Sequence, residues 1–156
     1  MTPGEKMGAL WRRFSAVPGG KWLFSRLVWV LVPYTATIGA NIRELRPGYA
    51  RVTLRDRRKV RNHLSSIHAL ALGNLGEMTS GMAAMLALPK GVRSIVTGMN
   101  IEYLKKARGT LTAESRPEVP QVVTEPVEMT VHCEIKDDTG DVVARTHVHW
   151  RLAPPK

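Results

Sequence analysis

The longest apolar segment of the chain follows a helical period. From Ile67 to Leu86, apolar residues cover almost every direction around a 3.6-residue repeat. They are Ile67, Leu70, Ala71, Leu72, Leu75, Met78, Met82, Met85 and Leu86. A helix that is apolar on all sides is buried, so we predict one long central helix here. Ser65 and Ser66 are its expected capping residues, and Pro89-Lys90-Gly91 is a typical end signal.

Alternating apolar and polar residues predict strands on both sides of this helix. The segment from Thr37 to Asp56 is expected to form two strands joined by the turn dipeptide Pro47-Gly48. Strands over 94–107 and 109–116 follow the helix, and then a hairpin of 126–136 and 141–152 turns at Asp138-Thr139-Gly140. This order predicts an α+β fold, with one antiparallel sheet of five to six strands wrapped around one helix.

The last hairpin has one apolar face and one polar face. Val131, Cys133 and Ile135 share the apolar face, so Cys133 is expected to be a small buried residue and not a nucleophile. Three histidines fall on the opposite, polar face: His132, His147 and His149. Their spacing does not match a zinc signature, so we predict no metal site.

Residues 1–34 differ from the domain predicted over 35–156 and form an N-terminal helical extension. Pro18-Gly19-Gly20 separates two helices, and Pro33 ends the second. The longest unbroken apolar run is too short to span a membrane. Two interpretations stay open. The extension packs on the domain or on a dimer mate, or it lies on a membrane surface with Trp22 and Trp29 on the apolar side.

The composition fits one globular domain of 156 residues with 44% hydrophobic residues. The single Cys excludes an internal disulfide and suggests a reducing cytosol. The net charge is +10, and the segment Arg43–Arg61 alone holds eight Arg and Lys against two acids. A basic face suits the phosphates of coenzyme A (CoA), an anionic membrane or nucleic acid. Few aromatic residues occur on this basic hairpin, so no nucleic-acid partner is predicted.

Glu77 lies in the middle of the predicted helix and is the only carboxylate between Asp56 and Glu102. Burying an unpaired ionised carboxylate is costly, so we treat Glu77 as a functional candidate. The alternative is a solvated stripe on the helix, shared with Gly73, Asn74 and Ser80.

The spacing around Glu77 resembles an active-site signature. Five residues separate Asn62 from His68, and eight separate His68 from Glu77. This spacing is similar to the catalytic frame of hotdog-fold acyl-CoA thioesterases of the phenylacetyl-CoA thioesterase-like group. The run 100–107 resembles the third strand of that family and its Asn-x-x-Tyr-x-x-Pro-Ala ending, and the likeness extends over about 36–152. The runs Arg61-Asn62-His63-Leu64 and Asn74-Leu75-Gly76-Glu77 mark this chain as an uncharacterised branch of that superfamily. It departs from the family's pattern at two points. Ala69-Leu70 replaces a Gly-Gly pair, and Lys106 replaces the proline.

The resemblance implies a hotdog fold with active sites that straddle two subunits. Glu77 would activate water or attack the thioester, Asn62 would orient the water or the carbonyl, and His68 would shape the loop. The backbone amide of Ala69, at a helix start, would act as the oxyanion site. A partner hydroxyl would come from Thr97. The expected substrate-binding residues are Arg58, His63, Leu70, Lys105, Lys106 and Arg108.

We therefore predict a cytoplasmic acyl-CoA thioesterase that needs no cofactor beyond the CoA of its substrate. A homodimer or a dimer of dimers is expected, because the central helix needs more apolar cover than one sheet provides. One alternative is a non-catalytic hotdog protein that binds acyl-CoA or lipid, favoured by Ala69-Leu70. The other is a basic membrane- or nucleic-acid-associating protein with an inactive site, with weak contact at the inner membrane surface through residues 1–34.

Overall fold

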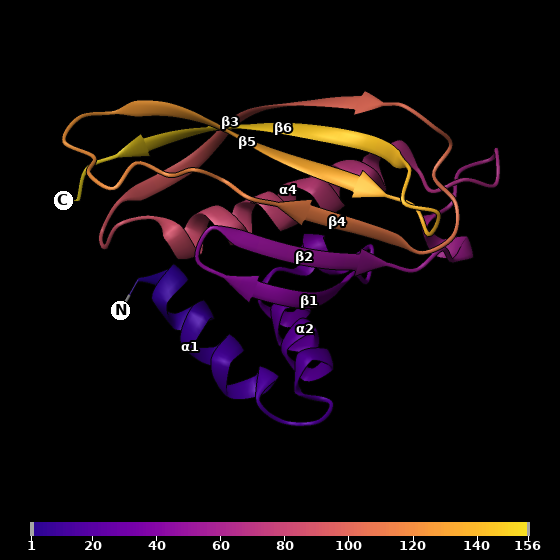
Figure 1. Ribbon diagram of the computed structural model, residues 1–156, viewed down its shortest axis with the longest axis horizontal. Coiled ribbons are helices and arrows are strands. Elements are labelled where there is room, and N and C mark those ends of the chain that lie inside the picture. The colour runs from indigo at the N-terminus through magenta and orange to yellow at the C-terminus, as the bar shows by residue number, and fades with distance from the viewer. Residues whose placement is uncertain (1, 156) are drawn as a thin grey trace.

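A six-stranded antiparallel sheet curves around one long helix (Figure 1). The computed structural model describes residues 2–155. The helix is α4 (Ala69–Ala87), and the strand order is β1-β2-β4-β5-β6-β3. The strands are β1 (Asn41–Arg46), β2 (Tyr49–Leu54), β3 (Arg93–Tyr103), β4 (Leu111–Ser115), β5 (Val127–Lys136) and β6 (Val142–Ala153). The predicted α+β architecture and both predicted hairpins are confirmed.

Helix α4 packs directly on the sheet. Leu75 and Thr79 are fully buried, and a Cβ at Gly76 would clash with the side chain of Thr146 on β6. Only a glycine allows this approach, so the apolar helix of the sequence is the centre of the core, as predicted. Gly48, at the turn between β1 and β2, has a φ of 72° and donates its N–H to the Ala83 carbonyl, which fixes that hairpin to α4.

The start of α4 differs from the prediction. The helix is capped by His68, not by Ser65 and Ser66, and His68 Nδ1 accepts the N–H of Leu70 at 3.1 Å. The two serines belong to a preceding loop, in which the N–H of Asn62 donates to the Ser66 carbonyl at 2.8 Å. Their polar groups are used by the loop, so the helix begins only after it.

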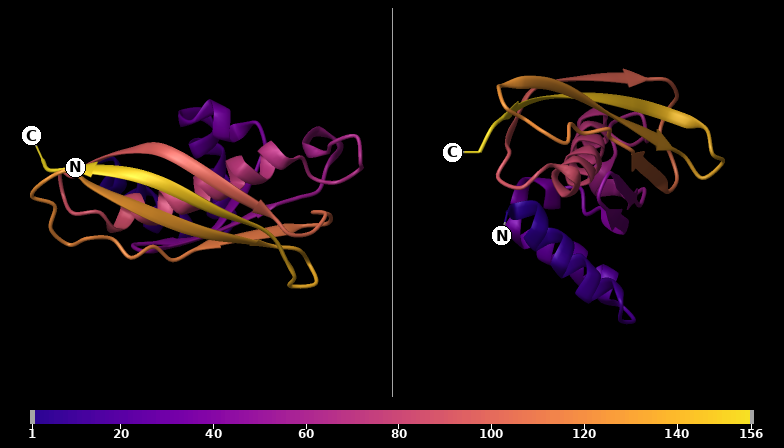
Figure 2. Two further views of the ribbon diagram at one scale, coloured as in Figure 1. Left: turned by 90° about the horizontal axis from the view of Figure 1, so that it is seen from above. Right: turned by 60° about the vertical axis from the view of Figure 1, so that its left-hand side comes forward.

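The N-terminal segment forms α1 (Pro3–Ser15), α2 (Gly20–Leu31) and the short α3 (Pro33–Ala36), on the side of α4 opposite the β3, β5 and β6 part of the sheet (Figures 1 and 2). Trp11 and Phe24 are 7% and 1% exposed and join the main core, whereas Trp22 is 54% exposed. Thus α1 and α2 pack on the rest of the chain through one face. Among residues 2–155, no helix has the length and apolar character needed to cross a membrane.

The two edge strands of the sheet, β1 and β3, differ in whether a helix covers them. On β1, the N–H of Ile42 donates to the buried Ser25 hydroxyl of α2, and the Trp29 indole N–H donates to the Ala40 carbonyl, both at 2.9 Å. Helix α2 therefore covers that edge. Strand β3 has only β6 as a neighbour among the described residues. Its exposed apolar side chains are Ile95, Val96, Met99 and Tyr103.

Candidate active site

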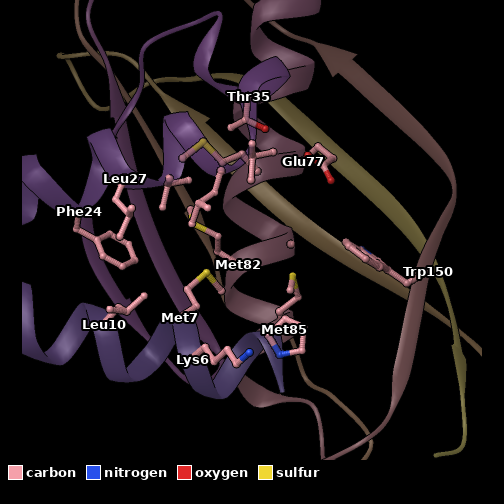
Figure 3. Close-up of a pocket in the computed structure, with 16 residues that line it drawn as sticks. Lys6, Met7, Leu10, Phe24, Leu27, Thr35, Glu77, Met82, Met85 and Trp150 are labelled. Atoms are coloured by element: carbon pink, nitrogen blue, oxygen red, sulfur yellow. The ribbon is translucent and has the colours of Figure 1, made fainter. Parts of the chain in front are cut away.

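Glu77 lies on a pocket of about 430 Å³ between the N-terminal helices, α4 and β6 (Figure 3). Apart from Glu77, Lys6 and Thr35, the lining is almost entirely apolar. The apolar side chains include Met7, Leu10, Phe24, Leu27, Met82 and Met85. Volumes of about 300–1,000 Å³ with few polar groups are typical of small-molecule sites. The pocket is therefore shaped for an apolar group next to one carboxylate.

The surroundings of Glu77 are those of a partly buried, unpaired acid. Burial raises the pKa of its carboxyl group above the ordinary value. The hydrogen bonds and ion pairs of residues 2–155 include none to this carboxylate. Gly73 and Ser80, which the solvated-stripe alternative would expose, are both buried, so that alternative is wrong. An acid without a structural partner is a candidate for chemistry.

Trp150 shares the pocket with Glu77. Its side chain is 7% exposed, and its indole N–H is buried without a hydrogen-bond partner among the described residues. Between the two lies Gly81, where an added Cβ would be 3.4 Å from the Trp150 ring and 3.8 Å from a Glu77 carboxylate oxygen. Gly81 thus brings the edge of the Trp150 ring and the unpaired Glu77 carboxylate to the same part of the pocket.

Asn62 organises the loop before α4. Its Oδ1 accepts the N–H groups of Leu64 at 2.9 Å and Ser66 at 3.2 Å, and also the Ser66 hydroxyl at 3.2 Å. These bonds hold the start of α4 in place. The structure therefore gives Asn62 a structural role in this loop, and its orienting role in catalysis stays a prediction.

The amides at the helix start are not equivalent. The N–H of Leu70 is used by His68, and the Leu70 side chain is 68% exposed. Ala69 is the first helical residue, so its N–H has no acceptor within the helix. Of the two amides, that of Ala69 is suited to bind an oxyanion.

A second pocket of about 380 Å³ brings together several predicted residues, Asn62, Ala69, Lys105 and Lys106. Lys105 Nζ lies 2.8 Å from Asp137 and 2.6 Å from Asp141. These carboxylates raise the pKa of Lys105, and Lys105 lowers that of Asp137. The charge of Lys105 is therefore already matched, which leaves Lys106 as the free cation of this pocket among the described residues.

The other predicted residues lie outside both pockets. Thr97 is the bulged residue between Val96 and Gly98 of β3, and its hydroxyl donates to the His149 carbonyl at 3.3 Å. Arg108 donates to the Leu64 carbonyl at 3.4 Å. Arg58 and His63 are exposed near the same loop.

One chain does not bring all of these groups together. Glu77 is eight positions after Ala69 in α4, and a rise of about 1.5 Å per residue places them about 12 Å apart along the helix axis. The Ala69 amide and the Glu77 carboxylate therefore cannot act on one carbonyl group within a single chain.

The polar face of β5 and β6 carries a histidine pair. The Nδ1 atoms of His132 and His147 are 2.6 Å apart, and His147 Nε2 is 3.1 Å from Glu102. Among residues 2–155, no three potential ligands are grouped to hold a metal ion. On the other face, burial raises the pKa of Cys133 to about 12, as expected for an inert thiol.

Trp150 and Gly81 were not predicted as site residues. Trp150 alternates with polar residues in 141–152, a pattern that indicates burial but cannot show that its N–H lacks a partner. A glycine inside a helix often has a packing or functional reason, and this signal was available for Gly81.

The comparisons with known proteins agree with the architecture. The family model described as "Domain of unknown function (DUF4442)" matches residues 20–152. No curated protein matches the sequence. The structural genomics protein APC5556 is 32% identical with a TM-score of 0.83, and the match covers 95% of this chain and 98% of that chain.

Two further crystal structures are more distant. PA5026 of Pseudomonas aeruginosa, described as a protein of unknown function and probable thioesterase, has 22% identity and a TM-score of 0.75, over 88% of this chain and 96% of that chain. The thioesterase HI1161 of Haemophilus influenzae has 13% identity and a TM-score of 0.65, over 78% and 82%. At these identities the likeness shows the fold alone. The predicted resemblance to the hotdog thioesterase superfamily is confirmed at that level.

Proposed function

Because the chain belongs to the family described as "Domain of unknown function (DUF4442)", whose description names no reaction, its function must be argued from the site, and we propose that it hydrolyses acyl thioesters such as acyl-CoA. The observation that carries this proposal is the unpaired, partly buried Glu77 at an apolar pocket. The names of the structural relatives PA5026 and HI1161 support the same reaction class.

In the proposed reaction, the ionised Glu77 accepts a proton from water while the water oxygen bonds to the thioester carbon. Its raised pKa makes it a stronger base than an ordinary carboxylate. The tetrahedral intermediate then breaks its C–S bond, and the leaving thiolate takes the proton from Glu77. The products are a carboxylic acid and a thiol. Direct attack by Glu77, followed by hydrolysis of the anhydride, is the other route open to the same residue.

The oxyanion of the tetrahedral intermediate requires a hydrogen-bond donor. The Ala69 amide of the same chain cannot supply it, because Ala69 and Glu77 are about 12 Å apart. We place the Ala69 amide of a second copy there, in agreement with the shared sites of the resembling thioesterases. The open edge of β3, with its exposed Met99 and Tyr103, is the surface by which two copies would pair. Asn62 and Thr97 stay predictions as the orienting amide and the partner hydroxyl.

The acyl group has a natural place in the pocket itself. Met7, Leu10 and Leu27 of the N-terminal helices face Met82 of α4 across it (Figure 3). An aliphatic chain would therefore meet mainly apolar side chains, with Lys6 and Thr35 as the polar lining residues besides Glu77. The polar end of the substrate would run toward Lys106 of the second copy, which lines the same pocket as its Ala69, with Arg58 and Arg108 near the same loop. Thus the N-terminal helices would contribute to substrate binding as well as to the core.

The test is a panel of acyl-CoA thioesters of increasing chain length, with the released thiol measured. Wild type is compared with Glu77→Gln and with the control Glu125→Gln, an exposed acid outside the pockets. We expect Glu77→Gln to lower kcat by about 10²–10⁴-fold and the control to match wild type. Equal turnover by Glu77→Gln and wild type would show that Glu77 is not catalytic.

A non-catalytic acyl-CoA or lipid carrier is the second candidate. It is favoured by one observation, the exposed Leu70 side chain and its occupied amide at the helix start, where the resembling family has glycines. Tight binding of a non-hydrolysable acyl-CoA analogue, without thiol release from any thioester in the panel, would support this carrier function.

A further inference from the structure

Helix α2 carries large apolar side chains on the face turned away from the core. Trp22, Leu23 and Val30 are 54%, 49% and 78% exposed, and Tyr34 of the adjacent α3 is 74% exposed. Trp22, Leu23 and Val30 fall within about 100° of one another around α2, with Arg26 between them, and together with Tyr34 we call them the α2 strip. Contiguous exposed apolar groups mark interaction surfaces.

A strongly basic pocket lies beside the α2 strip, between α2 and the β1–β2 hairpin. Its volume is about 430 Å³. No Asp or Glu lines it, and its five cationic side chains are Lys21, Arg26, Arg43, Arg55 and Arg57. None of the five forms an ion pair among residues 2–155. Unmatched charges that converge from several elements are suited to bind a phosphate.

Specific contacts position several of these cations. The Arg26 guanidinium lies 3.9 Å from the ring centroid of Trp29 and 4.7 Å from that of Trp22. Arg57 donates to the Ile38 carbonyl at 2.6 Å. Arg43 donates to the Thr53 hydroxyl at 2.8 Å. Contacts within the chain therefore hold these cations around the basic pocket.

We propose that the α2 strip and the basic pocket together dock the protein on an anionic lipid membrane. Headgroup phosphates would occupy the pocket, and the strip would enter the boundary between headgroups and acyl chains. A soluble phosphate would satisfy the cations but leave Trp22, Leu23 and Val30 in water. A second copy would bring two identical basic pockets together, which repels. Of these three occupants, a lipid surface alone complements both the charge and the apolar strip, and the net charge of +10 favours approach to it.

The experiment is flotation of the full chain with vesicles of phosphatidylcholine, with and without phosphatidylglycerol. We expect binding only to the anionic vesicles, weakened by added salt. Arg55→Glu should weaken binding at least about fivefold, because one basic residue at such a surface has roughly that effect. Val30→Ser should weaken it as well. The matched controls Lys90→Glu and Val122→Ser, both exposed and outside the surface, should bind like wild type.

Four outcomes would overturn the proposal. They are no binding to anionic vesicles at low salt, equal losses for Arg55→Glu and Lys90→Glu, binding of inorganic pyrophosphate without vesicle binding, and a change of oligomeric state in Val30→Ser by sedimentation. Arg43→Glu provides a second charge variant. Circular dichroism of every variant distinguishes a loss of vesicle binding from a loss of the fold.

Discussion

Glu77 and Trp150 border the same small space, and a single Cβ on Gly81 would contact both of them, at 3.8 Å and 3.4 Å. One residue brings an unpaired carboxylate and the other a buried N–H donor without a partner. Natural structures rarely leave such groups unsatisfied unless a ligand or a reaction uses them. The pair therefore offers direct tests of the site.

Gly81→Ala should separate stability from activity. The added methyl group fits without a clash, and alanine favours a helix interior by about 0.5–1 kcal/mol over glycine. We expect a folded variant that is at least as stable as wild type, with thioester turnover reduced because the methyl group fills the space between Glu77 and Trp150. Urea unfolding and the thiol-release assay measure the two effects. The comparison variant Gly76→Ala should be destabilised, since its Cβ clashes with Thr146.

Trp150→Phe removes the indole N–H and keeps most of the ring. A buried donor without a partner contributes nothing favourable to the fold, so the free energy of unfolding should fall only by the small cost of the lost ring atoms. If the N–H binds substrate, affinity for an acyl-CoA analogue should fall about fivefold, the value of one hydrogen bond of about 1 kcal/mol. Titration calorimetry of both proteins gives the ratio. Unchanged affinity would remove Trp150 from the site.

Glu77 should make stability depend on pH in the opposite sense to most acids. Burial raises its pKa, so the folded state holds the proton more tightly than the unfolded chain does. Its stabilising contribution is complete below the ordinary carboxyl pKa and is lost as pH rises through the raised folded value. Glu77→Gln should thus melt a few degrees above wild type at pH 7, and the difference should vanish below about pH 4. A variant that melts lower at pH 7 would show that the carboxylate stabilises the fold.

Catalysis by wild type should follow the same ionisation. Only the ionised Glu77 can accept a proton, so thioester turnover should decline on the acid side, with a midpoint above the ordinary pKa of a glutamate. A flat profile through that range would argue against a carboxylate base.

Met99→Arg tests the open edge of β3. Met99 is 40% exposed on a strand with one free edge, and an arginine there would face its own copy across a two-fold axis. Wild type should sediment as a dimer or larger, and the variant near the chain mass of 17.3 kDa. Val122→Arg, at a site 74% exposed in a loop, is the control. A wild-type monomer at micromolar concentration would contradict the shared site.

The two aromatic residues of α2 should differ in their importance for the fold. Phe24 is 1% exposed within the main core, so Phe24→Ala should cost about 3–5 kcal/mol of stability. Trp22 is 54% exposed, and Trp22→Ala should change stability by less than about 0.5 kcal/mol. Thermal and urea unfolding measure both. A larger loss for Trp22→Ala than for Phe24→Ala would mean that α2 packs through the opposite face.

The sequence predicted the elements whose signals are local. The hairpin turning at Pro47-Gly48 and the all-apolar helix around Glu77 were clear because period and turn chemistry are visible in a short window. The start of α4 was wrong because Ser65 and Ser66 are equally good as caps and as loop residues, and Asn62 decides between the two through hydrogen bonds.

Features that depend on contacts between residues far apart in the sequence could not be predicted. Lys105 was expected at a phosphate, but two acids more than 30 positions along the chain pair with it. Trp11 was not expected in the core, and Trp150 did not stand out from other buried aromatics. Such properties follow from tertiary packing, which one sequence does not specify locally.

Helix α2 lies between the apolar pocket and the outer surface and contributes side chains to both. Phe24, Leu27 and Leu31 line the apolar pocket, while Trp22 and Arg26 belong to the outer surface. Because the helical period sends these two sets in different directions, a substitution can shorten or lengthen the pocket without touching the outer surface, and the reverse also holds. Selection could thus tune the chain length of the acyl group and the attachment of the protein independently, within a single helix of twelve residues.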